Sequence, residues 1–143
     1  VCPQHDVIWS ELTVREHLEF FSKAKGVSPE RLQSEVDQLI RDVNLEEKEF
    51  ALAGTLSGGQ KRRLSAAVAL GGGSKVVFLD EPSSGVDPYS RRQLWDCLRQ
   101  KKEGRTLILT THFMDEAETL GDRIAIMAAG KVKCVGSALF LKS

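Results

Sequence analysis

Two adjacent carboxylates, Asp80 and Glu81, follow directly after the apolar run at residues 76–79. A short apolar run between glycines and acids predicts a strand that is buried on both faces, as in a parallel sheet. Carboxylates at the end of such a strand are costly unless they are solvated or coordinate a ligand. Asp80 therefore has the chemistry to hold Mg²⁺, and Glu81 has the chemistry to orient or deprotonate a water molecule.

A second group of residues, Leu-Ser-Gly-Gly-Gln at 56–60, stands at the predicted start of a helix. Ser57 can cap this helix, and Gly58 and Gly59 have no side chain to keep a ligand from the backbone. The first N–H groups of a helix lack internal partners and carry partial positive charge, so they favour phosphate. An ordinary capped helix after a loop also fits this pattern, and the five residues alone leave both interpretations open.

A third group is Thr111-His112, which follows the apolar run at 106–110. This run predicts a second buried strand. Because ligands of open α/β sheets bind at the carboxyl ends of the strands, we expect His112 at the same edge as Asp80 and Glu81. A donor there can stabilise charge on a phosphate. The three groups together are the kinds of part that nucleoside triphosphate hydrolysis needs.

Caps and hydrophobic periodicity predict the elements that position these groups. The first half is expected to be helical, with helices starting after Thr13, Ser28 and Ser57. The second half alternates strands and helices, which predicts an α/β fold with a mostly parallel sheet. We expect strands at 76–79, 106–110 and 124–127, a hairpin partner at 132–135, and helices after Asp87, at 114–120 and after Ser137.

Three side-chain expectations accompany these elements. Asp37 and Arg41 stand four residues apart and predict a solvated ion pair. Lys61 and its two arginine neighbours at 62 and 63 predict a solvated helix face. Trp9 is expected to pack rather than to stack on a nucleotide.

Composition excludes several classes of function. The chain has 143 residues, which indicates one domain, and its net charge of +0 gives no basic excess for binding nucleic acid. Three scattered cysteines without a CxxC spacing favour reduced thiols over a metal site or disulfides. No apolar run approaches the length of a membrane span. The chain begins without methionine, and we expect it to be a segment of a longer polypeptide.

The order of these motifs resembles the nucleotide-binding domain of ABC transporters over essentially all 143 residues. Residues 56–60 match the signature motif, 76–80 match Walker B, and 83–87 resemble the D-loop, with Gly-Val where many members have Ala-Leu. Gln4 stands at the Q-loop glutamine and His112 at the switch histidine. Residues 2–6, 85–92, 111–117 and 121–126 are similar to the A subfamily, whose members mostly move lipids or sterols.

The resemblance implies a partial P-loop NTPase fold, with an α-helical subdomain at about 10–72 and the C-terminal part of the RecA-like core at about 73–143. It implies roles in ATP and Mg²⁺ chemistry. Asp80 would hold Mg²⁺ through water, and Glu81 would be the general base. His112 would hydrogen-bond the γ-phosphate, and Gln4 would sense Mg²⁺ and the γ-phosphate.

Other residues would act on a nucleotide held by a second nucleotide-binding domain in a head-to-tail dimer. The resemblance assigns this role to Asp87 and to the signature residues Ser57, Gly58, Gly59 and Gln60. It also implies transmembrane partners for the helices at 13–43 and a place at the cytoplasmic face of a membrane. Gln4 as a surface residue and Asp87 as only a helix cap remain alternatives.

The chain departs from the family pattern at the phosphate-binding loop: no G-x-x-x-x-G-K-[ST] motif occurs in it. We expect that motif to precede Val1, and we expect the isolated chain to bind ATP poorly and not to hydrolyse it. Two other functions stay open: a soluble ABC ATPase of translation or DNA maintenance, and a non-catalytic module that completes a partner's site. The short helical span between Gln4 and Ser57 argues against the DNA-repair type, which inserts a long coiled coil.

Overall fold

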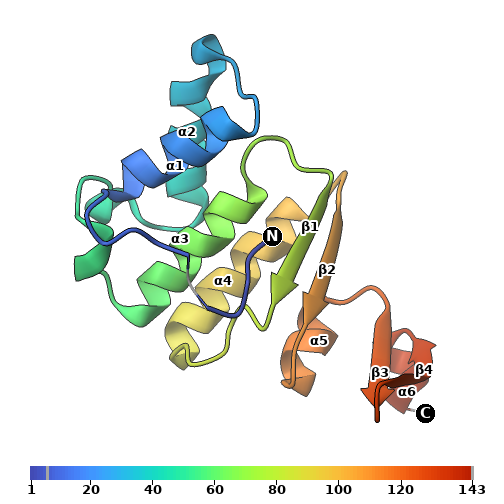
Figure 1. The fold of residues 1–143 in the computed structure, drawn as a ribbon. Coiled ribbons are helices and arrows are strands. Elements are labelled where there is room, and N and C mark those ends of the chain that lie inside the picture. The colour runs from blue at the N-terminus through green and yellow to red at the C-terminus, as the bar shows by residue number, and fades with distance from the viewer. Residues whose placement is uncertain (6, 143) are drawn as a thin grey trace. The chain divides into compact units, whose positions relative to one another are not determined.

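The computed structural model describes residues 1–5 and 7–142 (Figure 1). The chain forms two compact units, Val1–Thr110 and Thr111–Ser143. The first unit contains the helices α1 to α4 and the strands β1 and β2, and the second contains α5, α6 and the strands β3 and β4. No helix among the described residues is both long and apolar enough to cross a membrane.

The first unit begins with a helical part, and its helix starts largely follow the sequence pattern. Helix α1 (Val14–Ala24) opens with a reciprocal capping box between Thr13 and Glu16, as predicted. Helix α2 (Pro29–Asp42) has proline in its first turn and Ser28 at its N-cap position, as predicted, but the Ser28 side chain makes no capping hydrogen bond. Two short 3-10 helices, η1 (Glu46–Lys48) and η2 (Ala53–Thr55), lead to helix α3 (Gly58–Leu70).

The remaining elements of this unit are β1 (Val76–Asp80), α4 (Pro88–Lys101) and β2 (Thr106–Thr110). Strands β1 and β2 pair in parallel, in register from Val76 opposite Thr106 to Asp80 opposite Thr110. Cys2 forms a parallel bridge with Leu79, and it exchanges backbone hydrogen bonds with Phe78 and Asp80. The N-terminal segment therefore extends the pair at the other edge of β1.

The prediction that both strands are buried on both faces was wrong. In β1 the side chains of Val77 and Leu79 are buried, but those of Val76 and Phe78 are 51% and 48% exposed. In β2 the side chain of Ile108 is 45% exposed. The cause is that α3 packs along one face of β1, while none of the described elements of this unit covers the other face.

The second unit forms a hairpin flanked by short helices. Helix α5 (Met114–Leu120) precedes β3 (Ile124–Ala128), which pairs antiparallel with β4 (Lys131–Gly136), and α6 (Ala138–Lys142) follows. Ala129 and Gly130 both have positive φ, as a two-residue hairpin turn requires. The predicted hairpin is confirmed. The described strands form one parallel pair, β1 and β2, and one antiparallel pair, β3 and β4.

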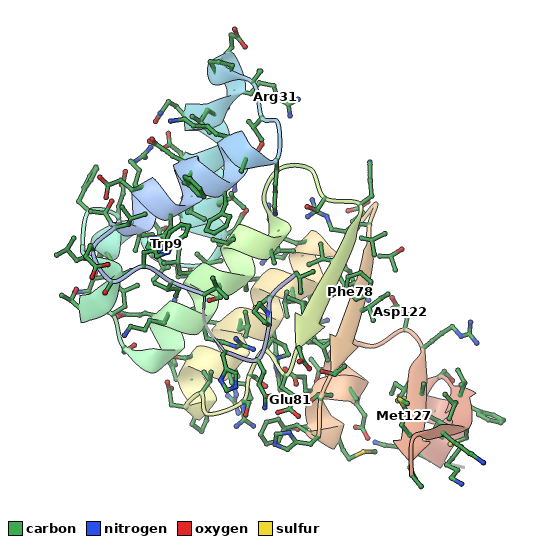
Figure 2. All side chains as sticks on the ribbon, viewed as in Figure 1. Trp9, Arg31, Phe78, Glu81, Asp122 and Met127 are labelled. Atoms are coloured by element: carbon green, nitrogen blue, oxygen red, sulfur yellow. The ribbon has the colours of Figure 1, made fainter. Side chains whose placement is uncertain are left out.

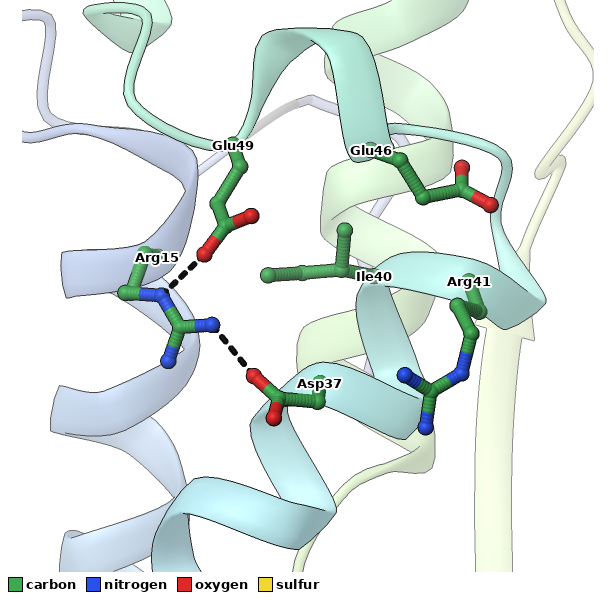
Figure 3. A pocket seen from close by; sticks show the side chains of 6 residues that line it. All are labelled: Arg15, Asp37, Ile40, Arg41, Glu46 and Glu49. Carbon is green, nitrogen blue, oxygen red and sulfur yellow. Dashed lines mark hydrogen bonds and ion pairs between the residues drawn. The ribbon is translucent and has the colours of Figure 1, made fainter.

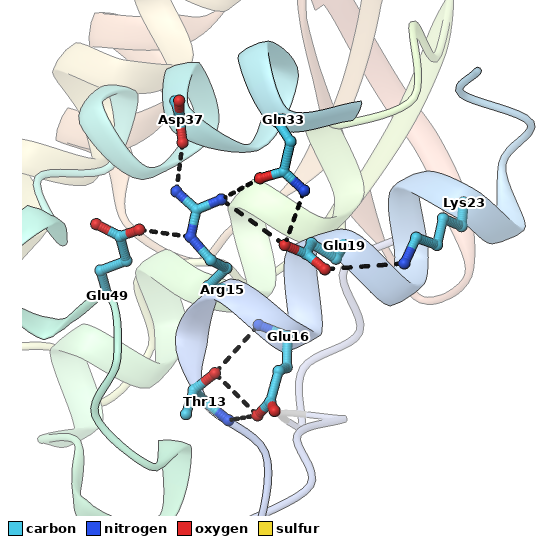
Figure 4. A network of polar contacts seen from close by, with 8 residues as sticks. All are labelled: Thr13, Arg15, Glu16, Glu19, Lys23, Gln33, Asp37 and Glu49. Atoms are coloured by element: carbon cyan, nitrogen blue, oxygen red, sulfur yellow. Dashed lines mark hydrogen bonds and ion pairs between the residues drawn. The ribbon is translucent and has the colours of Figure 1, made fainter. Parts of the chain in front are cut away.

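Arg15 joins α1 to α2 and to the residue that follows η1 (Figure 4). Its guanidinium donates to Asp37 of α2, to Glu49 beyond η1 and to Gln33. Asp37 thus pairs with Arg15 and not with Arg41, so the predicted pair within α2 was wrong. A cation from a neighbouring helix reaches Asp37, which the spacing within one helix does not show.

The side chain of Trp9 packs in an aromatic cluster of the same unit, as predicted. Its ring is stacked on Phe21 at 5.5 Å and on His17 at 5.9 Å. His17 is fully buried, and its Nε2 accepts from the backbone N–H of Trp9 at 3.0 Å. Its Nδ1 lies 2.8 Å from the carbonyl oxygen of Thr13, so both ring nitrogens have partners.

Candidate functional site

The carboxyl end of β1 brings Gln4 and Glu81 together. Because the bridge between Cys2 and Leu79 is parallel, the N-terminal segment carries Gln4 past the end of β1. The amide Nε2 of Gln4 donates to Oε2 of Glu81 at 3.0 Å. Two residues that lie 77 positions apart in the sequence thus share one hydrogen bond, beside Asp80. Figure 2 labels Glu81 at this end of the strand.

Thr110, at the end of β2, completes this corner of the first unit. Its hydroxyl donates to Oδ1 of Asp80 at 2.5 Å. The backbone N–H of Glu81 donates to both the carbonyl oxygen and the hydroxyl oxygen of Thr110, each at 3.1 Å. Sequence reasoning did not single out Thr110. Its position in the sequence could have identified it, because Thr110 is the last residue of the strand that pairs with the strand of Asp80.

The backbone at Glu81 lies in the left-handed region, with φ of 44°. For a residue with a Cβ, this conformation costs of order 1–3 kcal/mol, and it persists only where the surroundings enforce it. The turn directs the chain away from the sheet straight after β1. It therefore leaves the Glu81 carboxylate beside Gln4 at the sheet edge.

The amino end of α3 is the second part of the candidate site. The hydroxyl of Ser57 accepts from the N–H of Gln60 at 3.2 Å, and Oε1 of Gln60 accepts from the N–H of Ser57 at 2.9 Å. Gln60 therefore belongs to a capping box, which the sequence analysis did not predict. Among residues 1–5 and 7–142, no acceptor is found for the N–H groups of Gly58 and Gly59, so the helix end keeps two donors for a ligand.

The two glycines at this end have different surroundings. A Cβ on Gly58 would meet nothing within 4 Å, which fits the expected close approach of a ligand. A Cβ on Gly59 would lie 2.6 Å from Oγ of Ser90 and 3.3 Å from Oδ2 of Asp87. Glycine at 59 is therefore required by the packing of α3 against the start of α4, a reason that the sequence analysis did not give.

Asp87 caps α4, as one of the two alternatives expected. Its Oδ1 accepts from the N–H of Ser90 at 3.0 Å and from the N–H of Tyr89 at 3.1 Å. The backbone N–H of Ser90, and next its side chain, hold the pKa of the Asp87 carboxyl below its ordinary value. The cap does not exclude a second role, because Asp87 is exposed and its Oδ2 faces Gly59.

Arg62 and Arg63 do not form a solvated face, so that prediction was wrong. Arg62 is 3% exposed and Arg63 is 7% exposed. The Arg63 guanidinium donates to the carbonyl oxygens of Val43 and Asn44 at 2.8 and 2.9 Å. Both guanidinium groups are buried against main-chain carbonyls from other segments that accept their N–H groups, although Nε of Arg63 has no hydrogen-bond partner among the described residues.

The residues near Asp80 offer part of a magnesium site. Mg²⁺ takes oxygen ligands, keeps several waters and is often held by one or two carboxylates together with substrate phosphates. Asp80 is exposed. The side-chain amide of Gln4 bonds to Glu81 through its nitrogen, and the oxygen of the same amide is a second candidate ligand. No cluster of three or more His, Cys, Asp or Glu occurs among the described residues. The donors fit a cation that also binds phosphate and water.

A pocket elsewhere on the first unit lies away from these residues (Figure 3). Its lining comes from α1, α2 and the η1 segment: Arg15, Asp37, Ile40, Arg41, Glu46 and Glu49. The Arg15 guanidinium is already paired with Asp37 and Glu49 (Figure 3). Three carboxylates line the pocket, so it does not suit a phosphate.

His112 belongs to the second unit, two residues past the end of β2. The side chain is exposed, and its ring centroid lies 4.1 Å from that of Phe113. The structure brings Gln4, Asp80 and Glu81 together within the first unit. The proximity of His112 to them stays a prediction.

Comparison with known proteins agrees with these motifs. The sequence model of the family described as ABC transporter matches residues 1–84. ATP-binding cassette sub-family A member 2 of Homo sapiens is 54% identical over 142 residues, which is 99% of this chain and 6% of that protein. Phospholipid-transporting ATPase ABCA3 of Mus musculus is 55% identical over 99% of this chain and 8% of its own length. The chain thus spans less than a tenth of these relatives.

Solved structures show the same fold. An ATP-binding subunit of an ABC transporter superposes with a TM-score of 0.83 at 28% identity, over 99% of this chain and 59% of that one. A dimeric ATP-binding cassette in a post-hydrolysis state, bound to ADP and Pi, gives a TM-score of 0.82 at 24% identity, over 95% of this chain and 61% of the other. The partial P-loop NTPase fold and the expected likeness to the A subfamily are confirmed. The chain belongs to the ABC transporter family.

Proposed function

We propose that this chain supplies hydrolytic and signature residues to an ABC-type ATPase, with ATP as its nucleotide. The observation that carries the proposal is the hydrogen bond between Gln4 and Glu81, formed beside Asp80 at the carboxyl end of β1. Ligands of open α/β sheets bind at such an edge. The side chains found there are those that phosphoryl transfer to water uses.

The roles follow from the chemistry of each side chain. Glu81 orients the attacking water and accepts its proton, and the Gln4 amide fixes one oxygen of its carboxylate. Asp80, oriented by the Thr110 hydroxyl, and the amide oxygen of Gln4 would hold Mg²⁺ together with water and phosphate oxygens. Bound Mg²⁺ supplies neutralisation of the negative charge on the phosphates. His112 donates to the γ-phosphate.

The amino end of α3 serves a nucleotide held by a second nucleotide-binding domain in a head-to-tail dimer. Ser57, Gly58 and Gly59 present a hydroxyl and backbone N–H groups at the positive end of a helix that has no acid in its first turn. Gln60 orders this end through the capping box. Asp87 acts across the same interface while it caps α4.

The complete gene product would couple hydrolysis to transport across a membrane, from the cytoplasmic face and through transmembrane partners. The relatives named phospholipid-transporting ATPases make a phospholipid the proposed cargo. In the same proposal, residues at about 10–72 form a helical subdomain and residues at about 73–143 form part of the core. Stimulation of ATP turnover by phospholipid vesicles tests the cargo.

Steady-state ATP turnover of the complete gene product and its Glu81→Gln variant tests the proposal. The variant keeps the shape of the side chain but loses the basic carboxylate, so turnover should fall at least about a hundredfold while ATP binding persists. Glu103→Gln is the control, because Glu103 is an exposed carboxylate in the turn before β2. Equal turnover in the Glu81 variant, or no turnover in the unmodified protein, would favour the non-catalytic module instead.

A further inference from the structure

The side chain of Arg62 contacts both segments that form the candidate hydrolytic site. Its Nε donates to the carbonyl oxygen of Pro82 at 2.8 Å, and its Nη1 donates to that of Pro3 at 2.6 Å. Its Nη2 donates to the carbonyl oxygens of Asp80 at 2.7 Å and of Glu81 at 3.0 Å. One guanidinium therefore binds three consecutive carbonyls around Glu81 and the carbonyl next to Gln4.

We propose that Arg62 is a positioning residue for the reaction, because it holds Glu81 and Gln4 in the relative position that their hydrogen bond requires. This inference rests on the proposed function. The four hydrogen bonds of Arg62 described above all reach main-chain carbonyls. It acts through the backbone on each side of them.

The backbone geometry at Glu81 is the first argument. Its positive φ is unfavourable for a residue with a Cβ, so the surrounding structure has to hold it. The carbonyls of Asp80 and Glu81 reach the same nitrogen of Arg62, and that of Pro82 reaches its Nε. These contacts favour the turned backbone over an extended one, because an extended chain points successive carbonyls in opposite directions.

The second argument is the chemistry of arginine. Four carbonyls that converge on one side chain need a planar group with several N–H donors in fixed directions, which guanidinium provides and ammonium does not. Arg62 is nearly fully buried, so water does not replace a lost donor. A lysine at position 62 would keep the charge and the helix but lose the fork.

Arg62 also connects the two parts of the candidate site. It lies in α3, whose amino end carries Ser57 and Gly58, and it reaches back to the backbone after β1. A helix turn is rigid, so displacement of the start of α3 moves the guanidinium that holds Glu81. The hydrolytic residues are therefore set by the position of the same helix that offers the open N–H groups.

Arg63 offers a matched control in the next position of α3. It is equally buried, and it also donates to two main-chain carbonyls, but these belong to Val43 and Asn44. Lysine at 63 therefore removes a buried guanidinium without touching residues 80–82. The two variants, Arg62→Lys and Arg63→Lys, separate positioning of Glu81 from general loss of stability.

The test compares both variants in the complete gene product by ATP turnover and by amide hydrogen exchange. We expect Arg62→Lys to lower kcat at least about tenfold with KM for ATP within about threefold, because misplaced reacting groups slow chemistry more than binding. In this variant the backbone amides of residues 81 and 83–86 should exchange faster. Arg63→Lys should leave kcat within about twofold and speed exchange near residues 43–46 instead.

Two results would overturn the inference. One is a kcat that falls in both variants in proportion to their loss of thermal stability. The other is unchanged exchange at residues 81 and 83–86 in Arg62→Lys. The exchange measurement needs no turnover, so it decides the role of Arg62 even if the unmodified protein does not hydrolyse ATP and the proposed function fails.

Discussion

The two ends of helix α3 are capped by different kinds of side chain, charged at the carboxyl end and neutral at the amino end. At the carboxyl end, Nζ of Lys25 donates to the carbonyl oxygens of Val68, Ala69 and Gly71 at 2.6, 3.1 and 2.9 Å. Arg105 donates to that of Leu70 at 3.0 Å. Two cations thus satisfy the carbonyls at the negative end of the helix dipole.

At the amino end, no charged side chain among the described residues caps the helix, although the Asp87 carboxylate faces Gly59 from the start of α4. The first turn of α3 contains no acid, and its cap is the neutral pair of Ser57 and Gln60. Helix α4 differs here, because the Asp87 carboxylate caps its amino end. Of these three helix ends, two are thus capped by charged side chains, and the amino end of α3 is capped by neutral ones.

This difference indicates what each end is for. A helix end with internal counter-charges contributes to folding, because its orphan groups are satisfied within the chain. An end that keeps free N–H groups and positive potential has donors left for an anion. If this account is right, changes at the carboxyl end should alter stability, and changes at the amino end should alter ATP turnover.

The largest effect on stability is expected at Lys25. Lys25→Met removes the donor to three carbonyls and should lower the free energy of unfolding by about 2 kcal/mol. Lys23→Met, two residues earlier in the chain, removes only an exposed ion pair with Glu19 and should cost about 0.5 kcal/mol or less. Urea denaturation measures both. Equal losses would show that the carbonyls of α3 do not depend on Lys25.

The second prediction separates the two glycines of the amino end. Gly59→Ala places a methyl group 2.6 Å from Oγ of Ser90 and should destabilise by about 1–3 kcal/mol. Gly58→Ala meets open space and should be neutral or stabilise by up to about 1 kcal/mol. Thermal unfolding measures both. Adding Ser90→Gly to Gly59→Ala should restore part of the loss, and failure to do so would contradict the contact.

The third prediction concerns the charged cap of α4 and is the smallest. The pKa of Asp87 is lowered in the folded state, so its ionised form adds stability above the ordinary aspartate pKa. This stability disappears as the pH falls through the lowered pKa. Asp87→Ala should therefore lower Tm at pH 7, and the difference from the unmodified chain should shrink in acid.

Asp87→Asn is the control for that titration. Asparagine caps a helix about as well as aspartate but does not ionise. Its Tm difference from Asp87→Ala should not follow the titration of a carboxyl group. A difference between the unmodified chain and Asp87→Ala that stays constant from pH 7 into acid would show that the charge of Asp87 does not contribute.

Local patterns in the sequence predicted the elements and the chemistry of the site. The caps at Thr13 and Asp87 are short-range hydrogen bonds within one turn, so their residue types and spacing are enough to identify them. Asp80 and Glu81 were recognisable for a similar reason, because they follow an apolar strand directly. The hairpin around Ala129 was marked by a two-residue turn.

What the sequence did not reveal depends on distant segments. Arg62 is buried because carbonyls about 20 and 59 positions away accept its N–H groups, and no spacing within α3 shows this. Asp37 pairs with Arg15 of another helix for the same reason. An apolar run predicts that a strand is buried, but which face is covered depends on elements packed against it, so the run alone does not show the exposure of Phe78.

The most direct test of the account is ATP turnover and Tm of the complete gene product with Ser57→Asp. Aspartate caps a helix as well as serine and favours the positive end of the dipole, so Tm should be unchanged or higher. Its charge would repel a phosphate at the amino end of α3, so turnover should fall by about a hundredfold. Turnover within about threefold of the unmodified protein, at unchanged Tm, would contradict the claim that this helix end is kept for a nucleotide.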